Sequence, residues 1–298
     1  MLWLTAVNSV ADSTAIAVLY PDVRAPYDRI FNDIVMGIKQ GSKVPVFTYA
    51  LKADDERQKV AAWLQQSGLA TVISLGSRGK AITGSLPSNF KVIVGASILS
   101  DDNAAQGHIG ISLSPAPGKM FAKLKELAPS VKTVNVVYHP QTNGWLVALA
   151  KRKAVEHNLQ LMAAPAADVR EAALLYKKLL AENVRGKSAI WLLQGDPTLD
   201  ERSLLPTILS KAWNKNHVVF SSNPSHVKRG ALFSLFPDNI GMGISLSDKA
   251  QQVVKGKNRD IDPLEDLLIA VNIRTAEHLA LKISRAQARK FNLVFPLK

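Results

Sequence analysis

The residues best suited to hold a charged ligand are Ser77 and Arg78, which stand between Gly76 and Gly79. They follow the apolar, strand-like residues 71–75 and open a short helical pattern. Glycines let a backbone approach a ligand closely, and the free amides at a helix start attract negative charge. A hydroxyl and a guanidinium fork suit a carboxylate or a phosphate. The pattern indicates either an anion site or an ordinary strand-to-helix turn with an exposed arginine.

Polar residues also follow apolar runs in the second half of the chain. Asp196 comes after the run 189–193, in a turn that suits a helix cap and would also face a ligand cleft. Residues 218–243 indicate a buried strand, a loop, a second strand and a helix that Asp238 or Asn239 can cap. Such loops at strand ends are where open α/β folds bind ligands. We expect them to build a pocket, with Asp196 in either a structural or a functional role.

No set of residues in the sequence matches a catalytic or metal site. The six histidines lack the spacing of a zinc-binding HExxH motif. The chain has no GxSxG nucleophile elbow, no GxxxxGK(S/T) phosphate loop and no cysteine. The adjacent carboxylates at 54–55 and 101–102 would point apart, which suits capping better than acid–base chemistry. We therefore expect no enzyme, no metal and no cofactor.

The composition indicates a globular protein with a basic surface. The chain has 298 residues, of which 47% are apolar and 20% charged, and its formal net charge is +13. The lysines and arginines are scattered over predicted helix faces and helix ends, without the interleaved aromatic residues of a single-strand binder. We expect a solvated basic surface and no nucleic-acid partner.

The N-terminal residues 1–11 contain a short apolar run and the small-x-small pattern Ser9-Val10-Ala11. That pattern is typical of a signal-peptidase site, although the basic start of a signal peptide is missing. We expect the remnant of a secretion signal or a disordered extension.

Strand-like and helix-like segments alternate along the chain, which predicts mostly parallel sheets with helices on both faces. The alternation restarts after Pro129, with a strand at 133–138. Two similar α/β lobes in one chain place a ligand cleft between them, at the carboxyl ends of both sheets.

Three segments resemble a known family: LKELAPSVKTVNVVYHPQTNGW (124–145), VVFSSNPSHVKRGALFSLFPDNIGMG (218–243) and VNIRTAEHLALKI (271–283). The family is the substrate-binding proteins of ABC transporters whose better-known members take tryptophan or tyrosine. The resemblance implies a type I periplasmic-binding fold, in which two doubly wound, Rossmann-like α/β lobes are joined by a three-segment hinge. At the cleft the chain departs from the family, for example with His139 before Pro140, so the fold is implied and that specificity is not.

The expected N-terminal lobe comprises residues 12–130 and 239–256, and the expected C-terminal lobe comprises 131–238 and 257–298. Crossovers near Ser130, Asp238 and residues 256–262 would form the hinge.

Ligand contacts are expected from residues at the ends of the predicted strands, namely Tyr20, Asp22, Tyr27, Ser77, Arg78, Gly79, Ser97, Tyr138, Asn143, Asp196, Ser222 and Asp238. An amino acid suits this set. Arg78 and the helix amides would hold its carboxylate, Asp196 or Asp238 its ammonium, and a tyrosine could stack on a planar group.

The family resemblance implies an extracytoplasmic, periplasmic protein, soluble or lipid-anchored, that captures a small ligand and presents it to an ABC permease. The residue set above suggests an amino acid or a related small anion as that ligand. The alternative is a sensor or adaptor of the same fold that regulates a membrane receptor or a signalling enzyme.

Overall fold

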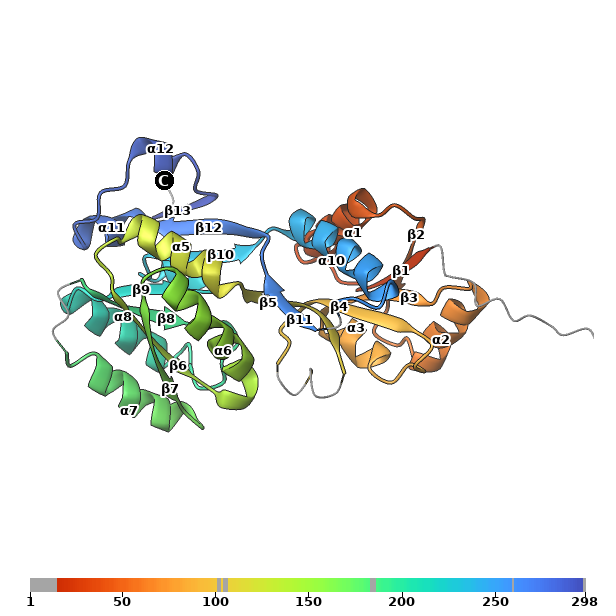
Figure 1. The fold of residues 1–298 in the computed structure, drawn as a ribbon, viewed down its shortest axis with the longest axis horizontal. Coiled ribbons are helices and arrows are strands. Elements are labelled where there is room, and N and C mark those ends of the chain that lie inside the picture. The colour runs from red at the N-terminus through yellow and green to blue at the C-terminus, as the bar shows by residue number, and fades with distance from the viewer. Residues whose placement is uncertain (1–14, 101–102, 104–106, 183–185, 259, 297–298) are drawn as a thin grey trace, which may run out of the picture.

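The structure is a computed structural model that describes residues 15–100, 103, 107–182, 186–258 and 260–296. The expected signal remnant at residues 1–11 therefore lies outside the described residues. The described chain forms two α/β sheets that lie one beyond the other along the long axis of the molecule (Figure 1). The predicted fold class is confirmed.

The first sheet has six strands in the order β11-β5-β4-β3-β1-β2. Its strands are β1 (Ile16–Pro21), β2 (Val46–Leu51), β3 (Thr71–Leu75), β4 (Lys91–Ser97), β5 (Ile109–Pro115) and β11 (Ile261–Leu264). The helices α1 (Asp28–Gly41), α2 (Arg57–Gln66), α3 (Gly76–Thr83) and α10 (Asn239–Val254) accompany it. We call this unit the N-terminal lobe.

The second sheet has seven strands in the order β13-β12-β10-β9-β8-β6-β7. Its strands are β6 (Thr133–Tyr138), β7 (Gln160–Pro165), β8 (Ser188–Leu192), β9 (Val218–Ser221), β10 (Phe233–Pro237), β12 (Leu267–Asn272) and β13 (Leu293–Phe295). Its helices are α5 (Pro117–Leu127), α6 (Pro140–Glu156), α7 (Val169–Leu179), α8 (Leu204–Asn214), α9 (Pro224–Lys228), α11 (Ile273–His278) and α12 (Arg285–Ala288). We call this unit the C-terminal lobe.

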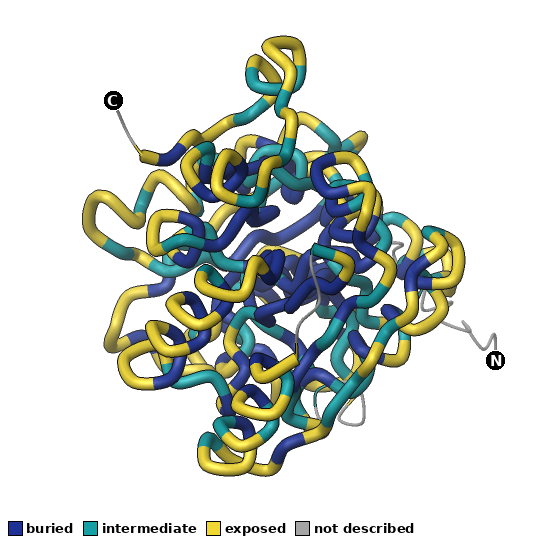
Figure 2. The backbone as a smooth tube through the Cα atoms, turned by 90° about the vertical axis from the view of Figure 1, so that its left-hand side faces the viewer, coloured by how far each residue is buried: buried dark blue, intermediate teal, exposed yellow. Residues whose placement is uncertain are grey.

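The strands are buried on both faces, as parallel strands covered by helices must be. Every residue of β3 and of β8 is buried, and so are the first four of β1. Each sheet has a hydrophobic core on either face. Figure 2 shows buried backbone in the middle of the molecule and exposed helices and loops around it. Among the described pairs, β10 and β12 are the antiparallel one. The carboxyl ends of the parallel strands therefore meet at one edge of each sheet.

Two glycines bring α10 unusually close to α1. A Cβ atom added at Gly37 would lie 2.0 Å from the carbonyl oxygen of Ile240, and one added at Gly243 would lie 2.2 Å from that of Ile34. Neither position could hold a side chain unless the helices moved apart. This close contact fixes the start of α10 against α1, at the side of the lobe that faces its neighbour.

Three crossovers connect the lobes and are joined by hydrogen bonds. The Ala116 N–H donates to the carbonyl of Leu264 at 2.8 Å, which ties the β5–α5 crossover to the β11–β12 crossover. The Asp238 N–H donates to the carbonyl of Asp266 at 3.0 Å, which ties the β10–α10 crossover to the same place. Hydrogen bonds thus join the three connecting segments between the lobes into one hinge.

Two of the crossovers lie away from their expected positions. Helix α5 packs through Met120, Phe121 and Leu124 into the core of the C-terminal lobe, whereas the expected boundary at residue 130 puts it in the other lobe. Strand β11 pairs with β5 in the N-terminal lobe, whereas residues 257–298 were expected in the C-terminal lobe. Pro129 ends a helix that already belongs to the second lobe, so the restart in the sequence follows the crossing. The crossover at Asp238 lies where it was expected.

Within the described residues, none of the helices is both long and apolar enough to cross a bilayer.

Candidate ligand-binding cleft

A pocket of about 690 Å³ lies between the two lobes beside the hinge. Its apolar walls come from Ile30, Phe31, Ile34, Ala96, Leu113, Ile240 and Met242 of the N-terminal lobe and from Pro224, Phe236, Pro237 and Leu268 of the C-terminal lobe. Its polar lining is Tyr27, Asp33, Gln194, Ser222, Asp238 and Asn239. The volume is typical of small-molecule sites. A ligand bound here would touch both lobes at once.

The apolar wall follows from helical spacing. On α1, Ile30 and Ile34 are four residues apart and share a face with Phe31. Ile240 and Met242 stand in the first turn of α10, which the glycine contact holds against α1. One face of this pair of helices therefore continues from the lobe's core into the pocket.

Asp238 and Ser222 are held in place by backbone and side-chain donors. Asp238 caps α10, with its Oδ1 accepting from the Gly241 N–H at 3.2 Å, which is the capping role expected from the sequence. The Oγ atom of Ser222 accepts from the indole N–H of Trp191 at 3.2 Å. The carboxylate of Asp33 lies 4.0 Å from the guanidinium of the exposed Arg29.

Gln194 differs from its polar neighbours because its Oε1 atom is buried and has no hydrogen-bond partner within the described structure. An amide oxygen in that position costs free energy unless something donates to it. Gln194 stands in the loop between β8 and α8 and lines the pocket.

The opposite wall contains a strained residue. Ala96, near the end of β4, has a φ of +52°, a conformation that non-glycine residues rarely adopt. The register between β4 and β5 shifts between Val94 and Ser97, so the strain coincides with an irregular strand end. Strained backbone of this kind gathers at functional sites.

Two loops meet across the cleft. Gly195, next to Gln194, has a φ of +65°, and a Cβ atom added there would lie 2.4 Å from Cδ1 of Ile98 in the other lobe. Ile98 follows β4 and Gly195 follows β8, so each loop reaches over from the carboxyl end of its own sheet. The positive φ and the contact both explain why glycine stands at residue 195.

Three of the residues expected from the sequence line this pocket: Tyr27, Ser222 and Asp238. Tyr27 precedes α1 and is 66% exposed, so its ring stands at the mouth. Ser222 follows β9, and Asp238 lies at the β10–α10 crossover. The structure brings these three together from both lobes.

The side chains of Asp196 and Asn143 are hydrogen-bonded to each other. One oxygen of Asp196 accepts from the His139 N–H at 2.9 Å and from the Asn143 amide at 2.8 Å. The other accepts from the backbone N–H of Thr198 at 2.9 Å and from its hydroxyl at 2.5 Å. All of these groups are within the C-terminal lobe. The structural role that the sequence left open for Asp196 is the one the geometry supports.

The Gly76–Gly79 turn is likewise explained by packing. Gly76 has a φ of +73°, and a Cβ atom at Gly79 would lie 2.7 Å from Oγ of Ser74. Arg78 donates from one guanidinium nitrogen to the carbonyls of Ala53 at 2.8 Å and Asp55 at 3.2 Å. It therefore fastens the β2–α2 loop and is not part of the pocket lining. Ser77 is exposed on α3.

The remaining expected contacts lie outside the pocket lining. Tyr20 and Tyr138 pack, partly buried, against the cores of their own lobes. Asp22 is exposed, and its N–H donates to the carbonyl of Leu51 at 2.9 Å. Ser97 is buried at the end of β4.

Sequence reasoning missed the apolar wall and Gln194. Phe31, Ile240 and Phe236 belong to ordinary amphipathic patterns, and such patterns do not distinguish a core from a cleft. Gln194 carried one signal, its place at the end of a buried strand, which was also the argument for Asp196. The sequence alone favours Asp196, because it carries a charge and Gln194 does not.

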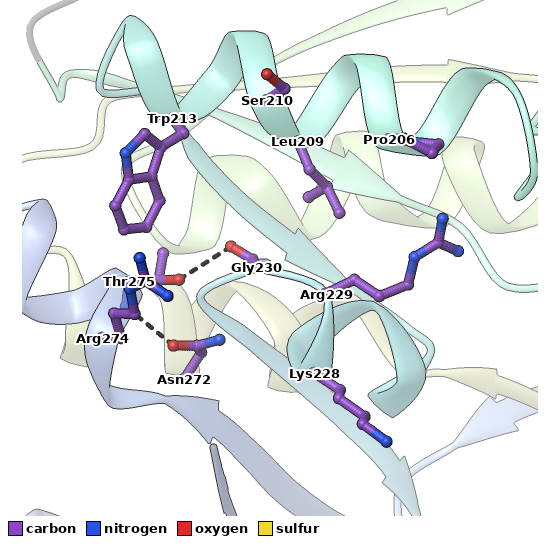
Figure 3. A pocket seen from close by; sticks show the side chains of 10 residues that line it. All are labelled: Pro206, Leu209, Ser210, Trp213, Lys228, Arg229, Gly230, Asn272, Arg274 and Thr275. Atoms are coloured by element: carbon purple, nitrogen blue, oxygen red, sulfur yellow. Dashed lines mark hydrogen bonds between the residues drawn. The ribbon is translucent and has the colours of Figure 1, made fainter. Parts of the chain in front are cut away.

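A second hollow of about 520 Å³ belongs to the C-terminal lobe alone (Figure 3). It is lined by Lys228, Arg229 and Arg274, and the guanidinium carbon of Arg274 lies 5.6 Å from the centroid of the Trp213 ring. Figure 3 shows Lys228 and Arg229 extending to the side away from Trp213, and Arg229 donates to the carbonyl of Glu201 at 2.8 Å. A ligand held here would bridge nothing across the hinge.

A serine, a histidine and a glutamate are connected near α9. Oγ of Ser221 lies 2.8 Å from Nδ1 of His226, and Nε2 of His226 lies 3.1 Å from a Glu201 carboxylate oxygen. Ser221 is completely buried and also accepts from the Asn223 N–H at 3.0 Å, so no substrate can reach it. Burial lowers the pKa of His226, with Glu201 opposing. The contacts brace α9. In the described part of the chain, no three His, Asp or Glu side chains gather as a metal site.

Solved structures share this architecture. A conserved domain protein of Vibrio cholerae matches with a TM-score of 0.54 at 20% identity, covering 94% of this chain and 99% of that one. The ABC domain from Streptococcus pneumoniae, solved with L-Trp, matches with a TM-score of 0.53 at 19% identity, covering 95% and 99%. The ligand-free, open CD0873 of Clostridium difficile, a substrate-binding protein with adhesive properties, matches with a TM-score of 0.64 at 15% identity, covering 96% and 100%. At these identities the likeness shows the fold.

The sequence comparisons identify the family. No curated protein sequence matches the chain. A family model described as ABC transporter substrate binding protein matches residues 82–288, which is more than half of the chain and includes part of the N-terminal lobe, most of the C-terminal lobe and all three crossovers. The chain belongs to the ABC transporter substrate-binding protein family.

Proposed function

We propose that this protein captures a small solute between its lobes and presents it to the permease of an ABC importer, on the outer side of the cytoplasmic membrane. The observation that carries the proposal is the pocket of about 690 Å³ lined by both lobes beside the hinge. A ligand there makes contacts with both lobes only when they are close, so it stabilises the closed arrangement that a permease can recognise. The periplasm is the compartment that the family resemblance implies.

An amino acid is the first ligand class to test. Asp238 lines the pocket, where it is available to an ammonium group, and the Streptococcus pneumoniae relative was solved with L-Trp. The carboxylate anchor expected at Arg78 is engaged elsewhere. The amino-acid proposal therefore keeps one of its two anchors.

The test is a thermal-shift screen of the purified full chain with amino acids, amines, sugars and small anions. A solute that binds the folded state raises the melting temperature by mass action. Small-angle X-ray scattering with and without the best ligand should show a smaller radius of gyration on binding, because the lobes close.

A matched pair of variants locates the site. Tyr27 lines the pocket and is 66% exposed, whereas Leu174 on α7 is 64% exposed and far from it. Neither Tyr27→Ala nor Leu174→Ala should change the melting temperature much, since both side chains are largely in water. Only Tyr27→Ala should reduce the ligand-induced shift. A screen without any shift, with unchanged scattering, would contradict the proposal and favour the sensor or adaptor alternative.

A further inference from the structure

The charged side chains that line the interlobe pocket are both acidic, and the cation next to them, Arg29, is 87% exposed and lies 4.0 Å from Asp33. Among the described residues that line it, Asp33 and Asp238 are the ionisable acids, and none is a lysine, arginine or histidine. The chain as a whole carries a net charge of +13, so a lining without cations runs against its composition. A carboxylate moved from water into such a pocket would lose hydration and gain no cationic partner among the lining residues, which is unfavourable.

Two of the backbone donors beside the pocket are already used. The Ser222 N–H donates to the carbonyl of Leu192 at 3.0 Å, and the Asp238 N–H donates to Asp266 at 3.0 Å. The first turn of α10 faces the pocket, but its capping carboxylate, Asp238, occupies the Gly241 N–H. A second carboxylate brought to that helix start would meet a like charge.

The pocket instead offers acceptors. The buried Oε1 atom of Gln194 has no partner, and the carboxylates of Asp33 and Asp238 stand on the same lining. An amino group supplies positive charge and several N–H donors, so it can satisfy an orphaned amide oxygen and a carboxylate together. The rest of the lining is apolar and includes Phe31, Phe236 and Leu268.

We infer that the pocket selects an apolar amine without a carboxylate, with Gln194 and Asp238 receiving the amino group. This inference rests on the proposed function and names the ligand class of the same site. It replaces the amino-acid ligand with its decarboxylated counterpart.

The experiment compares three matched pairs by isothermal titration calorimetry on the full chain: tryptamine with tryptophan, tyramine with tyrosine, and isopentylamine with leucine. Each pair differs in the carboxylate alone. We expect at least one amine to bind about tenfold or more tightly than its amino acid, the difference one uncompensated buried charge makes. Equal or tighter binding of the amino acids would overturn the inference and leave the proposed function standing.

If none of the six compounds binds, the inference is overturned as well. The broader solute screen then decides the proposed function on its own, because a sugar or another solute that raises the melting temperature would support capture without an amine.

Three variants test the assigned contacts. Asp238→Asn retains a helix-capping residue and removes the charge, and it should weaken amine binding about tenfold. Gln194→Leu should also weaken it, whereas Gln194→Glu should preserve or strengthen it, since a carboxylate accepts from an amine better than an amide does. Weaker binding to Gln194→Glu would show that the amide N–H is the group that matters and would overturn the assignment.

Arg24→Ala is the control. Arg24 lies in the exposed loop before Tyr27 and does not line the pocket. Its removal should leave the amine affinity and the amine-to-amino-acid ratio unchanged. A loss of amino-acid binding in this variant would reveal a carboxylate anchor outside the lining and contradict the inference.

Discussion

Gln194 and Asp196 stand two residues apart in one loop, and the structure treats them in opposite ways. Asp196 accepts four hydrogen bonds within its own lobe, whereas the Oε1 atom of Gln194 accepts none in the described structure and lines the cleft. The charged residue is the more conspicuous in the sequence. The neutral residue is the one with capacity left for a ligand. A polar group at a strand end thus becomes a candidate contact through what remains unsatisfied in the fold, rather than through its charge.

The largest expected effect comes from substituting Asp196, whose carboxylate oxygens both have their hydrogen-bond partners. Asp196→Ala leaves the His139 N–H, the Asn143 amide and both donors of Thr198 without their acceptor. It should lower the unfolding free energy by about 3 kcal/mol. Urea denaturation measures it. Asp196→Asn, which keeps one accepting oxygen, should cost less. If both variants unfold at the wild-type midpoint, Asp196 is not the structural residue described.

Gly195, between the two, is expected to show an intermediate effect. Gly195→Ala forces a Cβ into a φ of +65° and towards Ile98, and should cost about 1–2 kcal/mol. Ile98→Ala removes the steric part and leaves the backbone part, so the double variant should recover some of the stability lost by the glycine substitution. Simple additivity of the two losses would show that the loops do not meet across the cleft.

The two buried histidines, His226 and His217, also differ in how many of their hydrogen-bonding groups have partners. Both ring nitrogens of His226 are engaged, whereas Nδ1 of His217 is buried without a partner in the described structure. Burial lowers the pKa of each below its usual 6.5. The two histidines therefore bind protons more readily in the unfolded chain than in the folded one. Their contribution to stability is complete above about pH 6.5 and is lost as the pH falls below it.

The measurement is the urea-denaturation free energy between pH 7.5 and 5. The variant His217→Gln, His226→Gln should lose less stability over this range than the wild type does, because two of the groups that take up protons on unfolding are gone. An identical slope in the two proteins would show that these histidines are not held neutral by burial.

The smallest effect is expected at Gln194 without ligand. Gln194→Leu removes an unsatisfied buried oxygen and should change the unfolding free energy by no more than about 0.5–1 kcal/mol, towards higher stability. A loss as large as that of Asp196→Ala would mean that Gln194 is a structural residue too, and the contrast between the two would fail. Differential scanning calorimetry resolves a change of this size.

The fold was predictable because its strands and helices have local sequence patterns. Buried strands such as β3 and β8 are short apolar runs, and the alternation with amphipathic helices implies parallel sheets. The crossovers were less predictable, since β5 passes into α5 through Pro115, Ala116 and Pro117 with no polar linker to mark the change of lobe.

The site was predictable only in part, for a physical reason. Tyr27, Ser222 and Asp238, which line the pocket, could be named as candidates because strand ends and caps have sequence signatures. Whether a polar side chain is free depends on partners far away in sequence, as for Asp196 with Asn143 or Arg78 with Ala53. Such pairings are set by the tertiary structure, and no local pattern announces them.

The contact of Gly37 with Gly243 has a consequence for synthesis on the ribosome. The N-terminal lobe needs α10 and β11, which the chain supplies only after most of the C-terminal lobe. Until Met242 and Leu246 of α10 have been synthesised, Ile34 and Ile38 of α1 lack neighbours that bury them in the folded lobe. The lobe that emerges first is thus the one that finishes last, and its exposed apolar helix face is where a nascent chain would need protection from aggregation.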